Sequence, residues 1–94
     1  MNVNTEAKIL VVDDDPEIRE LLGIILKNSG YEVLEFGDSI SFFDRCNRVL
    51  PELVILDIML PGDDGLTILQ KLRGDLRTKN IPVIMVTAKA TELD

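Results

Sequence analysis

Aspartates occur at two places where the sequence passes from an apolar run into a loop. Asp13, Asp14 and Asp15 follow the run ILVV, and Asp57 follows LVIL. Carboxylates that lie within about 4–6 Å of one another repel and raise each other's pKa, so a group of them requires a cation. The chain has no histidine and a single cysteine. An oxygen-only donor set suits a hard cation, and we therefore expect Mg²⁺.

The position of Asp57 indicates a second kind of chemistry. A carboxylate can act as a nucleophile in phosphoryl transfer and form an aspartyl phosphate. Asp57 stands alone at the end of an apolar run, and the Pro61-Gly62 break that follows would turn the chain away and leave the carboxylate accessible. Thr87, which follows the run VIMV, would add a hydroxyl suited to a phosphoryl oxygen.

These residues must be positioned by strands that alternate with helices. We expect strands at 8–13, 31–36, 53–57 and 82–86, and helices at about 16–29, 39–50 and 66–73. This alternation predicts βαβ units and a parallel sheet, whose strands all end at the same edge. If the first and third strands are neighbours, the aspartates of both loops converge on one pocket. The second strand, YEVLEF, carries two glutamates and is expected at an edge.

The helices are expected to bury one apolar stripe each. The predicted stripes are Ile18, Leu21, Leu22, Ile25 and Leu26 in the first helix, Ile40, Phe43, Cys46 or Asn47, and Leu50 in the second, and Leu66, Leu69 and Leu72, with Ile68 beside them, in the third. Asp15 is expected to cap the first helix, and Gly30 to end it. Asp63 and Asp64 are expected to form a solvated turn, and Cys46 to be a core residue.

The totals exclude several classes of function. With 10 Lys and Arg against 17 Asp and Glu, the net charge is −7, so we expect no nucleic-acid binding by this piece. Its apolar runs are far shorter than the roughly 18 residues that span a bilayer, and the first eight residues do not read as a secretion signal. We therefore expect no membrane association and a cytoplasmic location. The 94 residues predict one domain.

Three segments together resemble the receiver domain of two-component response regulators: KILVVDDDPEIRELL, LVILDIMLPGDDG and IPVIMVTAK. The resemblance extends over essentially the whole chain, so residues 1–94 are interpreted as a partial receiver domain. It implies an α/β fold of the flavodoxin-like (CheY-like) doubly wound type, with four parallel strands in the order 2-1-3-4 and three helices. The last strand and helix of such domains would be missing.

The resemblance also implies roles for individual residues. Asp57 would receive a phosphoryl group from a sensor histidine kinase or a histidine phosphotransfer protein. Thr87 matches the switch hydroxyl, and Ala88 matches the small residue beside it. Such a domain catalyses its own phosphorylation and dephosphorylation and is not an enzyme acting on a separate substrate. The implied Mg²⁺ ligands are Asp13, Asp14, Asp57 and the main-chain oxygen of Met59.

Two other functions stay open. Receiver domains carry a lysine on a fifth strand, and the sequence ends before such a strand. The fourth strand would then be an exposed edge open to pairing with a second copy, so the chain could act as a phosphorylation-independent binding or dimerisation module. The other alternative is a phosphohydrolase of the haloacid dehalogenase type. That class has a second aspartate two residues after its nucleophile, whereas Met59 occupies this position after Asp57.

Overall fold

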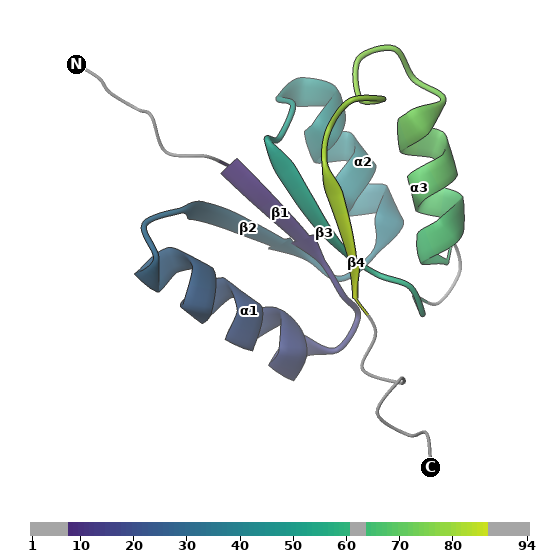
Figure 1. Cartoon of the computed structure of the whole chain (residues 1–94). Coiled ribbons are helices and arrows are strands. Elements are labelled where there is room, and N and C mark those ends of the chain that lie inside the picture. The colour runs from purple at the N-terminus through teal and green to yellow at the C-terminus, as the bar shows by residue number, and fades with distance from the viewer. Residues whose placement is uncertain (1–7, 61–63, 87–94) are drawn as a thin grey trace, which may run out of the picture.

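A computed structural model describes residues 8–60 and 64–86, which form a parallel sheet with helices on both faces (Figure 1). The four strands lie in the order β2-β1-β3-β4, and every neighbouring pair is parallel. The expected flavodoxin-like α/β architecture is thereby confirmed. In chain order the elements are β1 (Lys8–Val12), α1 (Pro16–Asn28), β2 (Glu32–Phe36), α2 (Ser39–Arg48), β3 (Leu53–Asp57), α3 (Gly65–Arg73) and β4 (Val83–Val86).

The sheet separates two hydrophobic layers, with α1 on one face and α2 and α3 on the other (Figure 1). On β1, Ile9 and Val11 belong to the layer of α1, whereas Leu10 and Val12 belong to the layer of Phe42. These four residues are at most 2% exposed. A strand covered on both faces needs apolar residues at every position, which explains the uninterrupted run ILVV.

The outer strands differ from the two central ones. As expected, β2 lies at an edge and exposes Glu32. Within the described ranges β4 forms the other edge, and Ile84 on it is 49% exposed. No helix in this part of the chain is long and apolar enough to cross a membrane.

An aspartate precedes each helix in the described ranges and accepts a hydrogen bond from a main-chain N–H of the first turn. These N-caps are Asp15, Asp38 and Asp64. Asp15 was expected in this role, whereas Asp64 was expected only in a solvated turn. Asp64 is exposed, and as the N-cap it accepts a hydrogen bond from the N–H of Thr67 at 2.8 Å, which fixes where α3 begins. Asp63 lies outside the described residues.

The predicted buried stripe of α2 is partly wrong. Ile40 is 82% exposed, and Leu50 lies beyond the end of the helix and is 42% exposed. The residues that face the sheet are Phe42 and Cys46, one helical turn apart and at most 2% exposed. Phe43 packs beside them, as expected. Apolar residues on more than one side of α2 leave its rotation ambiguous in the sequence, and contact with the sheet decides which of them is buried.

The stripes of α1 and α3 need similar corrections. On α1, Leu22 and Leu26 pack against the sheet, whereas Leu21 and Ile25 are more than half exposed. The contact is narrower than a five-residue stripe because α1 packs beside no other helix on its face of the sheet in the described structure (Figure 1). On α3, Leu66 is also more than half exposed. The buried residues are Ile68 and Leu72, with Leu69 partly buried beside them.

Candidate metal centre

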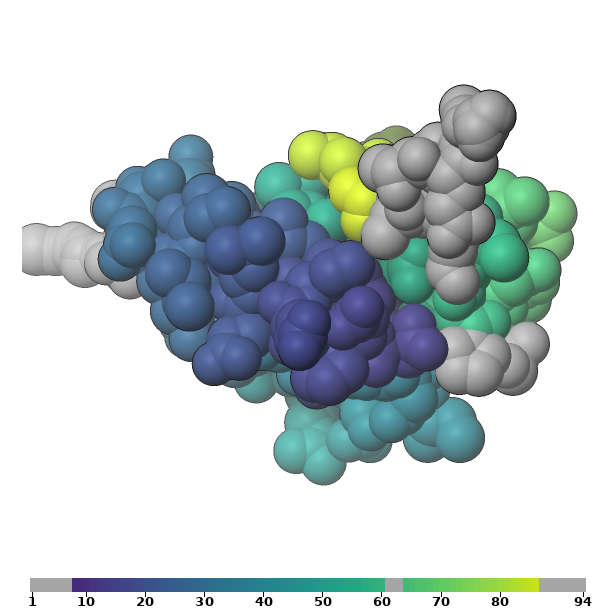
Figure 2. All heavy atoms as spheres, turned by 90° about the horizontal axis from the view of Figure 1, so that it is seen from below, coloured from purple at the N-terminus to yellow at the C-terminus, as the bar shows by residue number. Residues whose placement is uncertain are grey.

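The register between β1 and β3 places two aspartates side by side. Val12 pairs with Leu56. Asp13 follows Val12, and Asp57 follows Leu56. Both strands end at the lower edge of the sheet in Figure 1, and Figure 2 views the molecule from that side. In Figure 2, the purple loop after β1 and the start of α1 lie at the front.

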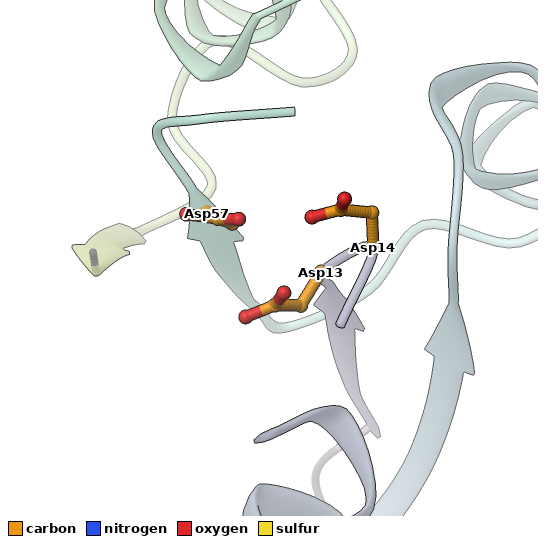
Figure 3. A group of neighbouring side chains, drawn as sticks. All are labelled: Asp13, Asp14 and Asp57. Carbon is orange, nitrogen blue, oxygen red and sulfur yellow. The ribbon is translucent and has the colours of Figure 1, made fainter. Parts of the chain in front are cut away.

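Asp14 joins this pair from the loop after β1. Each of the three aspartates offers a carboxylate oxygen, and these oxygens all lie within 4.8 Å of one another. Figure 3 shows Asp14 and Asp57 pointing toward each other across the gap between the strand ends, with Asp13 beside them. Asp13 and Asp57 are only 4% and 7% exposed, whereas Asp14 is exposed. The expected convergence of these residues is therefore observed.

Burial raises the pKa of Asp13 above its ordinary value of 3.8. The main-chain N–H of Asp15, which donates to Oδ1 of Asp13 at 2.9 Å, works against this rise. The negative charges of Asp57, Asp14 and Asp15 add to the rise. Ionised carboxylates in this cluster therefore repel one another, and a bound cation would remove that cost.

The carboxylate of Asp57 is held by its own loop. The N–H of Met59 donates to Oδ1 of Asp57 at 3.1 Å, and the N–H of Ile58 donates to the carbonyl of Val86 at 3.0 Å. The first bond orients the carboxylate, and the second joins the start of the loop to β4. The main-chain oxygen of Met59 as a metal ligand stays a prediction.

Gly65 lets α3 begin directly behind Asp57. A Cβ atom at this position would collide with the main-chain oxygen of Asp57 and lie only 2.7 Å from the Cα of Ile58. The N–H of Gly65 also donates to the carbonyl of Ile58 at 2.9 Å. Only glycine allows this close approach without displacing the loop that carries Asp57. Its signal in the sequence is the Asp64-Gly65 pair at the predicted start of a helix.

Arg19 is a neighbour of the site that the sequence did not identify. Its guanidinium donates to the main-chain oxygen of Asp13 at 2.7 Å. On sequence alone Arg19 belongs to the polar side of a predicted helix, and nothing in its spacing marks this contact.

Other predicted residues lie apart from the cluster or outside the described structure. Thr87 and Ala88 fall outside the described residues, as does the Pro61-Gly62 break, so their predicted roles stay predictions. Cys46 is buried in the core, as expected, and burial raises the pKa of its thiol to about 11. Both properties favour a neutral packing residue over a reactive thiol.

The donor set fits a hard divalent cation. Three carboxylates from two strand ends can supply oxygen ligands, and the cluster contains no nitrogen or sulfur donor. Mg²⁺ is typically bound by one or two carboxylates together with water and a phosphoryl oxygen. The carboxylate of Asp14 is exposed, so the cluster is open to solvent on this side.

Comparison with known sequences identifies a family. A family model for the response regulator receiver domain matches residues 9–94. The DNA-binding dual master transcriptional regulator RpaA of Synechocystis is 46% identical over 81 residues, which are 86% of this chain and 34% of RpaA. The phosphate regulon transcriptional regulatory protein PhoB of Escherichia coli is 38% identical over 93% of this chain and 38% of PhoB. The chain thus spans little more than a third of the length of these curated relatives.

Solved structures give the same result. The N-terminal domain of a response regulator receiver protein from Methanoculleus marisnigri is 37% identical, with a TM-score of 0.83 over 88% of this chain and 68% of that one. The chemotaxis protein CheY4 of Vibrio cholerae is 27% identical, with a TM-score of 0.82 over 86% of this chain and 68% of that one. Sequence and structure therefore identify the same family.

Proposed function

The chain belongs to the response regulator receiver family, and we propose that it is a phospho-accepting signalling domain in which Asp57 receives a phosphoryl group in a Mg²⁺-dependent reaction. The observation that carries this proposal is the cluster of Asp13, Asp14 and Asp57 at adjacent strand ends. The donor would be a sensor histidine kinase or a histidine phosphotransfer protein. The relatives named as DNA-binding are much longer, and a net charge of −7 argues against DNA contacts by this piece.

The proposed reaction is a transfer between two nucleophiles. A carboxylate oxygen of Asp57 attacks the phosphorus of a phosphohistidine, and an O–P bond forms as the N–P bond breaks. The nitrogen lone pair returns to the imidazole, which takes a proton from solvent. The Met59 N–H holds the Asp57 carboxylate in one orientation, and Gly65 keeps α3 close behind it. Such positioning is the main contribution a protein can make to phosphoryl transfer.

Asp13 and Asp14 would hold the metal together with Asp57 and the main-chain oxygen of Met59. When bound, Mg²⁺ supplies positive charge that offsets the repulsion among these carboxylates and the incoming phosphoryl oxygens. This assignment is supported by the oxygen-only donor set and by the close approach of the three carboxylates, whose oxygens lie within 4.8 Å of one another. In the proposed switch, Thr87 binds a phosphoryl oxygen, Ala88 leaves room beside it, and the surface next to β4 changes.

A phosphodonor experiment tests the function. The chain is incubated with acetyl phosphate and MgCl₂, and its intact mass is measured with and without EDTA. We expect a Mg²⁺-dependent gain equal to one phosphoryl group, and no gain in Asp57→Asn. A gain that persists in Asp57→Asn, or that EDTA leaves unchanged, would contradict the assignment. Asp44→Asn removes the same charge from an exposed residue of α2 and should behave like the wild type.

A second candidate function is self-association through β4. Within the described ranges β4 pairs only with β3, and Ile84 on it is half exposed. A strand edge with apolar side chains can add a strand from a second copy. Light scattering of the unphosphorylated chain tests this proposal. A concentration-dependent dimer that becomes monomeric in Ile84→Lys would support association through β4. A monomer at all concentrations would refute it.

A further inference from the structure

Arg19 connects the helix α1 to the loop that carries Asp13 and Asp14. Its main-chain N–H donates to the carbonyl of Asp15 at 3.0 Å. Its guanidinium Nη1 donates to the carbonyl of Asp13 at 2.7 Å, a short bond from a charged donor. The first bond is the ordinary helical bond to the carbonyl of the N-cap, so the contact specific to the arginine side chain is the bond to Asp13.

The main-chain hydrogen bonding between β1 and β2 ends at Asp13. The N–H of Asp13 still donates to the carbonyl of Phe36 at 3.0 Å, in continuation of the β1–β2 ladder. The carbonyl of the same residue is bound instead by a side chain from α1. This carbonyl belongs to the peptide plane that includes the nitrogen of Asp14. Fixing it restricts the backbone on which the Asp14 carboxylate is mounted.

Glu35 on β2 pairs with the Arg19 guanidinium, and two glycines leave space for these side chains. Nε of Arg19 lies 3.9 Å from Oε1 of Glu35 on β2, and both side chains are less than 30% exposed. A Cβ atom at Gly37 would lie only 2.9 Å from Nη1 of Arg19, and one at Gly23 would collide with the Glu35 carboxylate. Two positions without side chains thus leave the space that this arginine and this glutamate occupy.

We propose that Arg19, held by Glu35 and accommodated by Gly37, is a positioning residue for the metal centre. It binds the main-chain oxygen of Asp13 and thereby fixes the backbone of Asp13 and Asp14 in the arrangement that binds Mg²⁺. The inference rests on the proposed Mg²⁺ site. Groups that orient metal ligands without touching the metal commonly change metal affinity by 10–100-fold when removed.

Electrostatics alone predicts the opposite result, which makes the inference testable. Removing a positive charge near a cation site should strengthen cation binding by reducing repulsion. If Arg19 acts by position, Arg19→Met should instead weaken Mg²⁺ binding by about tenfold. Arg48→Met removes the same charge from an exposed ion pair on α2 and is the matched control. Arg19→Lys, which retains one cationic donor, should recover part of the affinity.

Gly37→Ala is a second variant that keeps Arg19 and all charges. The new methyl group would displace the tip of Arg19, so we expect a loss of Mg²⁺ affinity in the same direction as in Arg19→Met. This variant also carries the test if Arg19→Met does not fold. Dissociation constants are measured by calorimetric titration of MgCl₂, and urea unfolding in EDTA reports the stability of each variant separately.

The possible outcomes separate the two proposals. If the wild type binds no Mg²⁺, the metal site itself is wrong. If the wild type binds Mg²⁺ and the folded variants bind it equally well or more tightly, Arg19 only supports the fold or acts through its charge. Weaker binding in Arg19→Met and Gly37→Ala, with partial recovery in Arg19→Lys and no loss in Arg48→Met, is the expected result.

Discussion

Asp13 and Asp57 follow a pair of residues, Val12 and Leu56, that are in register on adjacent parallel strands. Both carboxylates are therefore delivered to the same place by the hydrogen bonding of the sheet, and both are nearly buried. The structural consequence is a concentration of negative charge that the fold without metal must tolerate. The functional consequence is a rigid set of oxygen ligands beside a candidate nucleophile.

Neutralising Asp57 should stabilise the metal-free protein. Asp57→Asn keeps an oxygen that can accept the Met59 N–H but removes the charge that repels Asp13. We expect a gain on the order of 1 kcal/mol in the free energy of unfolding in EDTA. With Mg²⁺ at about 100 times its dissociation constant, the wild type should gain roughly 3 kcal/mol and Asp57→Asn much less.

Urea unfolding with EDTA or with MgCl₂ measures both effects. Asp44→Asn serves as the control, because its carboxylate is exposed and paired with Arg48 at 3.1 Å. An Asp57→Asn protein that is less stable than the wild type in EDTA, or that Mg²⁺ stabilises fully, would show that repulsion at the cluster has been overestimated.

Gly65→Ala should disturb both the fold and the site. The added methyl group must push α3 away from the main chain at Asp57, which we expect to cost about 1–3 kcal/mol of stability and to slow phosphorylation. Gly74→Ala is the matched control, because its methyl group would lie at an ordinary 3.4 Å from the nearest atom and its φ is −87°. Equal stabilities for the two variants in thermal unfolding would refute the close approach.

The corrected orientation of α2 predicts a contrast between two residues of one helix. Phe42→Ala removes a fully buried ring and should cost about 3–5 kcal/mol, a loss large enough to unfold a small domain. Ile40→Ala changes a side chain that is 82% exposed and should alter stability by less than about 0.5 kcal/mol. Comparable losses would mean that the helix is rotated toward the face that the sequence predicts.

The Cys46 thiol should make stability fall at alkaline pH. Its pKa in the fold is about 11 against an ordinary value of 9.0, so the folded state keeps its proton where the unfolded chain has lost it. The contribution is complete below pH 9.0 and is lost as the pH rises to about 11. Cys46→Ala should be less stable at neutral pH but show a flatter decline in urea midpoint over this interval. Urea midpoints that fall equally with pH in both proteins would contradict the raised pKa of Cys46.

The short apolar runs predicted the strands and the aspartates that follow them, because both are local features of the sequence. The strand order β2-β1-β3-β4 was instead expected from the resemblance to receiver domains, and the structure confirms it. Once β1 and β3 are neighbours, the parallel sheet leaves Asp13 and Asp57 no other arrangement.

The helix faces and the supporting contacts could not be predicted in the same way. Ile40, Phe42 and Phe43 are all apolar, and only contact with the sheet determines which of them is buried. The bond from Arg19 to the Asp13 carbonyl depends on how α1 packs, and the close approach at Gly65 depends on where α3 starts relative to β3. Such contacts arise from tertiary packing, for which a single sequence carries no periodic signal.

Calorimetric titration with MgCl₂ tests the central claim most directly, because it asks whether the three aspartates form one metal site. Asp14→Asn leaves the buried pair unchanged and removes the exposed ligand, whereas Asp44→Asn removes the same charge from α2. We predict one Mg²⁺ per wild-type chain, unchanged affinity in Asp44→Asn, and binding weakened by about tenfold or more in Asp14→Asn, a loss of roughly 1.4 kcal/mol. Equal Mg²⁺ affinity in all three proteins would contradict the proposed metal centre.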